Sequence, residues 1–242
     1  MSARANSHLG KPHLHYRVCE STNDVAKQLA EHGSPHGTTV TADEQTSGRG
    51  RQGREWVAPP RSSLLMSAIA RPVTESHKLA PLAAALAVAE TCETLANVEA
   101  RIKWPNDVWI EKRKVSGILV EARPDQVSER SWVIVGIGLN VAVRLEDMPA
   151  ELQQTATTLG LPIGTDALTP LVARLDHWLA SDSAAIVVAW RERDALRGHQ
   201  ISWADGTGTA EGVDDHGNLV IELADGELKT LTAGEVHLQV HH

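Results

Sequence analysis

One short segment combines glycine and arginine in a way that suits anion binding. Residues 47–54 read Ser-Gly-Arg-Gly-Arg-Gln-Gly-Arg. Glycine allows close backbone approach, so consecutive N–H groups can point at one anion, and arginine adds fork-shaped donors for phosphate or carboxylate. Taken alone, the segment also fits a solvated basic loop or an RNA-binding stretch. It therefore predicts a basic loop whose ligand must be read from other motifs.

A second motif places a carboxylate and an amide next to a lysine. Residues 103–107 read Lys-Trp-Pro-Asn-Asp and end in a turn signal. Such a group could hold Mg²⁺ and a nucleotide, although an ordinary turn with an exposed lysine has the same composition. Arg113 and Lys114 add two cations on the hairpin that follows, where they could also serve as a charged strand edge.

Several other chemistries lack their motifs. No Gly-Lys-Ser/Thr follows the glycines at the spacing of a Walker loop. Gly136-Ile137-Gly138 is not a dinucleotide fingerprint, because position 141 is valine and no helix follows. His8, His13 and His15 cluster without a nearby carboxylate or cysteine at ligand spacing, so we expect solvated histidines there.

The composition is that of a soluble globular protein. The chain has 242 residues, of which 42% are hydrophobic, and a formal net charge of −8. This charge argues against nucleic acid and anionic membranes as general partners. No uninterrupted apolar run reaches the ~20 residues that span a bilayer. Cys19 and Cys92 match no zinc or redox spacing and predict inert thiols in a reducing cytoplasm.

Periodicity predicts a mixed α/β domain followed by a small β domain. The predicted strands are 14–18, 38–41, 63–70, 108–110, 115–121 and 132–143, and the predicted helices are 25–30, 77–98 and 174–196. Residues 1–13 read as a loose leader and residues 44–55 as a loop. Beyond Gly198, alternating strands and turns at 204–206, 214–217 and 224–226 predict a small antiparallel barrel.

The order and spacing of the motifs resemble the biotin–protein ligase family. The matching residues are 21–23 (Ser-Thr-Asn), Gln45, 48–56 (Gly-Arg-Gly-Arg-Gln-Gly-Arg-Glu-Trp), 103–107, 113–121 (Arg-Lys-Val-Ser-Gly-Ile-Leu-Val-Glu) and 136–140 (Gly-Ile-Gly-Leu-Asn). Each motif alone is weak, but five in the same order are specific. The resemblance covers residues 21–143, and the β domain after Gly198 matches the family's C-terminal module.

The resemblance implies both an architecture and a reaction. It implies an α/β (α+β) catalytic domain over residues 1–197, with a mixed sheet related to that of class II aminoacyl-tRNA synthetases, and an SH3-like β-barrel over 198–242. It implies that the biotin carboxylate attacks the α-phosphate of ATP, giving biotinyl-5′-AMP and pyrophosphate. A lysine of a biotin carboxyl carrier protein then attacks the acyl carbon and expels AMP.

Family roles carry over to the matching positions. Biotin would be bound by Ser21, Thr22, Asn23, Gln45, Arg49, Gly50, Arg51, Lys114 and Gly117. The nucleotide would be bound by Arg49, Arg51, Trp56, Lys103, Asn106, Asp107 and Asn140. Arg49, Arg51 and Lys114 would be catalytic, and Asp107 is the candidate for Mg²⁺. From the residues alone, Gly117 also fits close backbone approach within a strand, and Trp104 and Trp109 fit packing positions.

Further expectations concern partners and alternatives. The segment before Ser21 is too short for a winged helix, so we expect a monofunctional cytoplasmic ligase, monomeric or weakly dimeric, that binds neither DNA nor membrane. A lipoate or octanoate ligase or transferase is the nearest enzymatic alternative, because such enzymes resemble this family in fold. A non-catalytic module that holds a peptide or nucleic acid is the alternative from another class.

Overall fold

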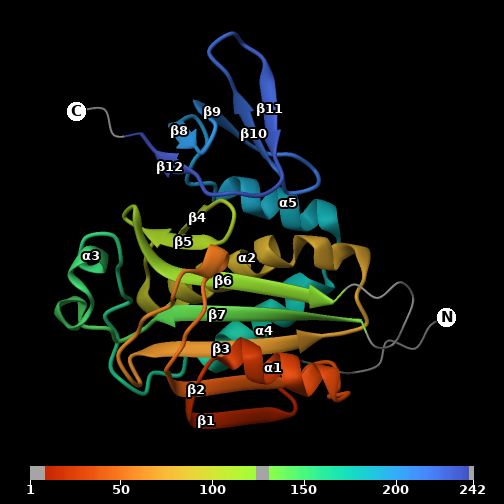
Figure 1. The fold of residues 1–242 in the computed structure, drawn as a ribbon, viewed down its shortest axis with the longest axis vertical. Coiled ribbons are helices and arrows are strands. Elements are labelled where there is room, and N and C mark those ends of the chain that lie inside the picture. The colour runs from red at the N-terminus through yellow and green to blue at the C-terminus, as the bar shows by residue number, and fades with distance from the viewer. Residues whose placement is uncertain (1–8, 124–130, 240–242) are drawn as a thin grey trace.

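The computed structural model describes residues 9–123 and 131–239, and these build two sheets with helices packed between and around them (Figure 1). The larger sheet has seven strands in the order β1-β2-β3-β7-β6-β5-β4. Only β1 and β2 pair in parallel, so the predicted mixed sheet is confirmed. The strands are β1 His13–Cys19, β2 Thr39–Gln45, β3 Ser63–Ala70, β4 Arg101–Lys103, β5 Asp107–Ile110, β6 Arg113–Arg123 and β7 Trp132–Asn140.

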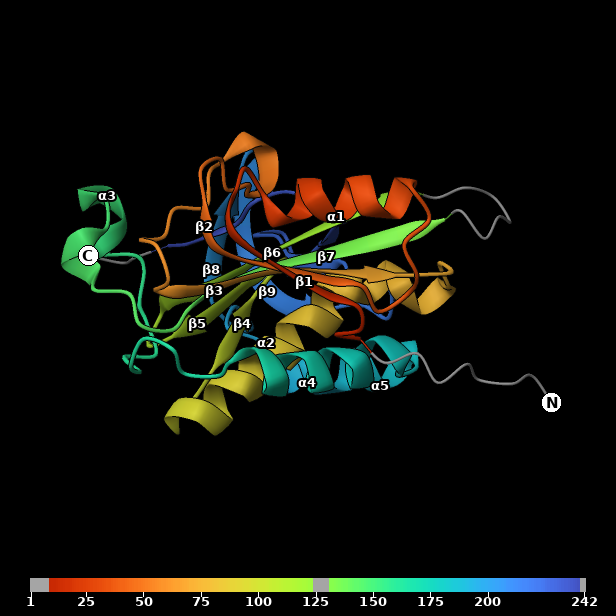
Figure 2. The same cartoon turned by 90° about the horizontal axis from the view of Figure 1, so that it is seen from below.

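Helices cover both faces of this sheet. Figure 2 shows α1 (Thr22–Glu31) on one face and α2 (Ala80–Ala96), α4 (Leu168–Ala180) and α5 (Ser183–Glu192) on the other. The short helical segments are Arg51–Gly53, Glu75–Leu79, Leu145–Asp147 and α3 (Ala150–Gln153). A small apolar cluster lies under α1, and the main core lies between the sheet and α2, α4 and α5.

Helix α2 runs through the centre of the main core. Its alanines from Ala80 to Ala89 are all buried although they lie on different sides of the helix, which is the pattern of a helix enclosed by protein. His77–Ala96 is long and apolar enough to cross a membrane by length and composition, but 67% of its apolar 18-residue window is buried inside the protein. Pro81 lies in the first turn, where it removes no helical hydrogen bond, and Asn97 ends the helix in a left-handed conformation.

Two points of chain organisation go beyond the sequence pattern or differ from it. The helical pattern expected over residues 174–196 is divided between two helices, because the Asp182 side chain accepts a hydrogen bond from the Ala185 N–H at 2.8 Å and starts a new helix. The loose leader is ordered from Leu9, which is buried in the main core and whose N–H donates to Asp176 Oδ1. Residues 1–8 of that expected leader lie outside the described residues.

The C-terminal strands form a separate antiparallel sheet that docks on the first. Its order is β11-β10-β9-β8-β12, with β8 Gln200–Trp203, β9 Gly206–Val213, β10 Leu219–Glu222, β11 Leu228–Leu231 and β12 His237–Leu238. The Trp104 indole N–H donates to the Gly217 carbonyl at 3.0 Å, and the Arg191 guanidinium donates to the Val213 carbonyl. These contacts hold the second sheet at the β4 end of the first.

Two histidines near the start of α2 make stability depend on pH. The Nδ1 atom of His36 accepts from the Arg71 N–H, and that of His77 accepts from the Thr74 N–H. Burial lowers the pKa of both imidazoles below their ordinary value of 6.5, although Asp176 partly opposes this shift at His36. The unfolded chain then binds protons more readily than the folded chain. We expect the free energy of unfolding to fall as the pH drops below 6.5.

Urea unfolding at about pH 7.5 and about pH 5.5 would measure this pH dependence. His77→Asn keeps an acceptor for the Thr74 N–H but does not titrate, so this variant should lose less stability on acidification. An equal loss in the variant and the wild type would contradict the assignment to His77.

Candidate active site

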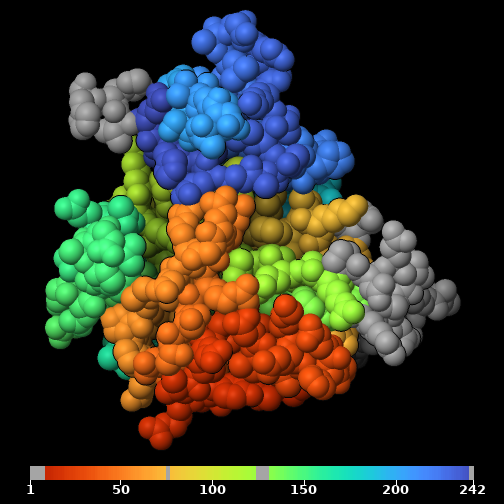
Figure 3. Space-filling view, in the orientation of Figure 1, coloured from red at the N-terminus to blue at the C-terminus, as the bar shows by residue number. Residues whose placement is uncertain are grey.

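A cavity of about 630 Å³ lies between the glycine-arginine loop, one face of the larger sheet and the C-terminal segment before β12. Figure 3 shows the loop reaching up to the C-terminal sheet. Every site residue predicted from the sequence lines this cavity: Ser21, Thr22, Asn23, Gln45, Arg49, Gly50, Arg51, Trp56, Lys103, Asn106, Asp107, Lys114, Gly117 and Asn140. The fold therefore brings all five sequence motifs to one place.

One end of the cavity is built on the first turn of α1. Gln45 Oε1 accepts from the Thr22 N–H at 2.7 Å and from the Thr22 hydroxyl at 3.0 Å. Ser21 precedes the helix, and its hydroxyl makes no capping bond among the described residues. Ser21 is buried and lines the cavity. Its hydroxyl is therefore available to a polar group of a ligand.

Asn23 makes most of the hydrogen bonds that fix this end of the cavity. Its Oδ1 lies 2.6 Å from Ser67 Oγ, and its Nδ2 donates to the Leu119 carbonyl and to Glu121 Oε2 at 2.9 Å. A Cβ at Gly136 would overlap the Asn23 amide, so only glycine fits at that position of β7. Asn23 thus ties α1 to three strands of the sheet and shapes the wall of the cavity.

Trp56 lies flat against the sheet in the middle of the cavity. A Cβ at Gly138 would lie 2.7 Å from Trp56 Cζ2, and one at Gly117 would lie 3.0 Å from Trp56 Cζ3. The ring packs on the sheet only because both positions are glycine. Close approach is therefore the structural role of Gly117, as its strand position suggested. Lys114 Nζ lies 5.7 Å from the centre of the indole ring.

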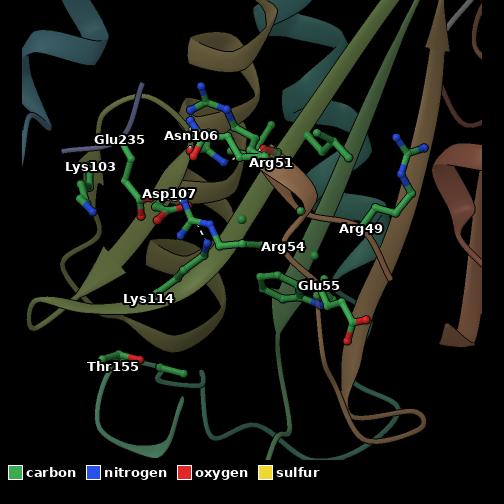
Figure 4. A pocket seen from close by; sticks show the side chains of 18 of the residues that line it. Arg49, Arg51, Arg54, Glu55, Lys103, Asn106, Asp107, Lys114, Thr155 and Glu235 are labelled. Atoms are coloured by element: carbon green, nitrogen blue, oxygen red, sulfur yellow. Dashed lines mark hydrogen bonds and ion pairs between the residues drawn. The ribbon is translucent and has the colours of Figure 1, made fainter. Parts of the chain in front are cut away.

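The other end of the cavity is cationic. Lys114 Nζ pairs with Asp107 Oδ1 at 2.7 Å, and Arg51 donates to Asn106 Oδ1 at 3.2 Å. Figure 4 shows Lys114, Asp107 and Arg54 pointing toward one another. Asp107 and Lys114 lie on the adjacent strands β5 and β6, where Asp107 pairs with Gly117 and Lys114 with Trp109, so the long Lys114 side chain reaches along the strands to Asp107.

Burial lowers the pKa of two cations that line the cavity. It lowers the pKa of Lys103 and of Arg51, while the nearby Asp107 carboxylate works in the opposite direction at both. Lys103 Nζ also lies 5.2 Å from the Trp109 ring centre. Cations that have lost part of their hydration attract an entering anion more strongly than exposed ones do. Trp109, expected only to pack, therefore also contributes to the cavity wall.

Arg49 is held apart from the cationic end. It forms ion pairs with Asp24 on α1 and with Glu121 on β6. Burial lowers the pKa of Arg49, but the two carboxylates outweigh this effect and the net direction is upward. Figure 4 shows its guanidinium pointing away from Lys114 and Asp107. In this structure Arg49 anchors the loop.

Asn140 holds the cavity wall on the opposite side from α1. Its Oδ1 accepts from the Ser63 hydroxyl at 3.1 Å, and its Nδ2 donates to the Thr157 carbonyl at 3.0 Å. Asn140 is buried. The Oδ1 end of the amide thus holds β3, and the Nδ2 end holds the segment that pairs with Lys114 through the Thr155 carbonyl and the Thr157 N–H.

Three residues in or behind the cavity wall were not among the predicted site residues, although Glu121 ends one of the family motifs. Glu235, from the segment before β12, forms an ion pair with Arg54 and links this segment to the glycine-arginine loop across the cavity (Figure 4). Ser67 and Glu121 contact Asn23 from strands distant in sequence. Among the described residues, no group of three His, Cys, Asp or Glu side chains is arranged to hold a metal ion.

Two family models match the chain. The model described as the biotin/lipoate A/B protein ligase family matches residues 14–140, and that described as the biotin protein ligase C terminal domain matches residues 197–238. The chain belongs to the biotin/lipoate A/B protein ligase family. Within it, the C-terminal match and the relatives described next identify the chain as a member of the biotin protein ligases.

The relatives match over nearly the whole chain. The biotin–[acetyl-CoA-carboxylase] ligases of Mycobacterium tuberculosis and Paracoccus denitrificans are each 34% identical, over 90% of this chain and over 86% and 96% of their own lengths. The bifunctional ligase/repressor BirA of Bacillus subtilis is 33% identical, over 95% of this chain and 75% of its own. The solved biotin protein ligase from Aquifex aeolicus in complex with biotin and ATP is 28% identical, with a TM-score of 0.76 and coverage of 95% and 99%.

Proposed function

We propose that the chain is an ATP-dependent biotin–protein ligase that works in two steps. A biotin carboxylate oxygen attacks the α-phosphorus of ATP and pyrophosphate leaves, giving biotinyl-5′-AMP. The ε-amine of a lysine on a biotin carboxyl carrier protein then attacks the acyl carbon. The C–O bond to AMP breaks, AMP leaves as the anion, and the amine loses a proton as the amide forms.

The observation that carries this proposal is a single cavity with a hydrogen-bonding end and a cationic end. Lys114 lies between Trp56 and Asp107, with Arg51 and Lys103 also lining the cavity. Adenylation brings two anions together, and negative charge builds up around phosphorus in the transition state. Cations fixed there favour the transition state over the separated reactants. No side-chain nucleophile is required.

The hydrogen-bonding end suits the head group of biotin. The cyclic urea of biotin offers one carbonyl acceptor and two N–H donors. The Ser21 hydroxyl and the Thr22–Gln45 pair line the cavity there, and Asn23 fixes the wall beside them. The apolar ring atoms can pack against Trp56 and Ile137, which also line the cavity. A ligand bound this way would direct its carboxylate toward Lys114.

The cationic end of the cavity also contains carboxylates that could bind Mg²⁺. Mg²⁺ in nucleotide sites is bound by one or two carboxylates together with phosphate oxygens. Asp107 and Glu235 both line the cavity, so hard oxygen donors of the right kind are present. Asp107 is the residue proposed to contact the ion, which would neutralise phosphate charge. Lys114 Nζ forms an ion pair with Asp107 Oδ1 at 2.7 Å. When the ion binds Asp107, Lys114 would turn toward the substrate anions.

The remaining roles follow from the reaction. The partner is the lysine-bearing carrier domain of a biotin-dependent carboxylase, and the ligase acts on it in the cytoplasm as a monomer or weak homodimer, without DNA. Cys92 is buried, which raises the pKa of its thiol to about 12, and Cys19 is half-buried. Neither cysteine forms a disulfide, which accords with a reducing compartment.

The transfer half of the reaction has a direct test. The chain would be incubated with biotin, ATP, Mg²⁺ and a purified carrier domain, and biotin on the carrier would be measured by intact mass. We expect one biotin per carrier, located on the acceptor lysine. A carrier with that lysine changed to arginine is the control and should stay unmodified. A carrier left unmodified while biotinyl-5′-AMP accumulates would refute the proposed acceptor.

Replacing Gly50 of the loop should increase the release of free biotinyl-5′-AMP. The Gly50 N–H donates to the Arg54 carbonyl at 2.7 Å, and a Cβ at Gly50 would lie 3.1 Å from that carbonyl oxygen. Gly50→Val would therefore hold the loop open and admit water to the mixed anhydride. We expect faster release of free biotinyl-5′-AMP, measured by a chase with unlabelled biotin. Unchanged release in a variant of wild-type stability would contradict this role.

A further inference from the structure

We propose that Glu121 is a positioning residue that couples the hydrogen-bonding end of the cavity to the glycine-arginine loop, by binding Asn23 and Arg49 with the same carboxylate. The proposal rests on the function proposed above and adds a residue whose task is to keep the loop closed over the adenylate. It predicts that the rate at which the loop releases the intermediate depends on the Glu121 side chain on the sheet.

The contacts place Glu121 at a junction of three elements. It lies on β6, a strand in the interior of the seven-stranded sheet. Its Oε2 accepts from Asn23 Nδ2 at 2.9 Å and from Arg49 Nη1 at 3.3 Å, and its Oε1 accepts from Arg49 Nη2 at 3.0 Å. The pairing with arginine is bidentate, which fixes the direction of the guanidinium as well as its distance.

The two carboxylates around Arg49 are not equivalent. The Glu121 side chain is 23% exposed and lies on the sheet, whereas the Asp24 side chain is 38% exposed and lies on the surface of α1. Ion pairs with less solvent around them are screened less. Of the two, only Glu121 also contacts Asn23 among the described residues. Glu121 is therefore the partner through which the wall of the cavity and the loop can influence each other.

A physical consequence follows for the ligand-bound protein. Asn23 is braced by Ser67, Leu119 and Glu121, so a change at Glu121 alters the wall against which the biotin head group would lie. The same change removes the bidentate partner of Arg49 and leaves only the more exposed Asp24 to hold this end of the loop. Losing Glu121 should thus loosen retention of the intermediate, and it should do so through Arg49.

A double-mutant cycle on adenylate release tests this coupling. Biotinyl-5′-AMP would be formed from labelled biotin and ATP in the absence of carrier and then chased, in the wild type, Glu121→Gln, Arg49→Gln and the double variant. Glutamine keeps an acceptor for Asn23 but cannot form the charged pair. We expect each single variant to release adenylate about fivefold faster than the wild type. The double variant should release it no faster than Arg49→Gln.

The other outcomes decide against the proposal. A double variant whose acceleration equals the product of the two singles would mean that Glu121 does not act through Arg49. If Glu121→Gln released biotinyl-5′-AMP at the wild-type rate, Glu121 would not be needed to keep the loop closed. A wild-type chain that forms no biotinyl-5′-AMP would instead refute the proposed function, so the two failures are distinguishable.

The contact between Glu121 and Asn23 is tested with a separate variant. Glu121→Leu removes both contacts, whereas Asp24→Asn removes only a carboxylate of Arg49 and serves as the matched control. Biotin affinity without nucleotide would be measured by calorimetry. We expect Glu121→Leu to bind biotin more weakly than Glu121→Gln, and Asp24→Asn to bind it like the wild type. Equal affinities of the leucine and glutamine variants, both with wild-type circular dichroism, would refute the coupling to Asn23.

Discussion

Replacing Lys114 with alanine is expected to slow adenylation by at least about 100-fold. Lys114 is the cation held between Trp56 and Asp107 at the cationic end of the cavity. Removing one donor that stabilises developing charge typically costs ~3 kcal/mol in the barrier. The loss should appear in the chemical step, because the interaction is stronger in the transition state than in the ground state.

Single-turnover formation of biotinyl-5′-AMP from saturating biotin and ATP measures this effect. Lys27→Ala is a suitable control, because Lys27 is exposed on α1 and does not line the cavity. The control should form adenylate at the wild-type rate. A Lys114→Ala rate within about tenfold of wild type, or ~1.4 kcal/mol, would contradict the assigned role.

Replacing Trp104 with alanine is expected to destabilise the protein by about 3–5 kcal/mol. The Trp104 side chain is buried in the main core, and its indole N–H donates to the Gly217 carbonyl in the C-terminal sheet. The substitution leaves a large cavity and removes a contact between the two sheets. Both effects lower the free energy of unfolding.

Urea unfolding followed by circular dichroism measures this loss, and phenylalanine provides the comparison. Trp104→Phe keeps an aromatic ring in the core but cannot donate to Gly217, so it should lose clearly less stability than Trp104→Ala. A change below about 1 kcal/mol in Trp104→Ala would show that Trp104 does not hold the two sheets together.

Local periodicity predicted the strands well where one pattern dominated. Ser63–Ala70 was predicted with the bounds it has, because a short continuous apolar run of this length is typical of a buried strand. The helix pattern over 174–196 hid a break at Ser181–Asp182, since apolar residues continue in helical spacing on both sides. The capping aspartate was the available signal.

The site was predictable as a set of residues but not as a set of contacts. The order of Ser-Thr-Asn, the glycine-arginine loop and Lys-Trp-Pro-Asn-Asp identified residues that line the cavity. Sequence could not predict that Arg49 pairs with Glu121 or Arg54 with Glu235, because these partners meet only after the sheets assemble. The roles of Gly136 and Gly138 likewise depend on which side chains pack against β7.

The central claim is that this cavity joins biotin to the α-phosphate of ATP, and pyrophosphate exchange tests it most directly. Labelled pyrophosphate would be incubated with the protein, ATP and Mg²⁺, with biotin, lipoate or octanoate in parallel. We expect label to enter ATP with biotin alone, and Lys114→Ala to abolish it. Exchange with lipoate instead would keep the fold and mechanism but overturn the substrate. No exchange with any acid, from folded protein, would contradict the account.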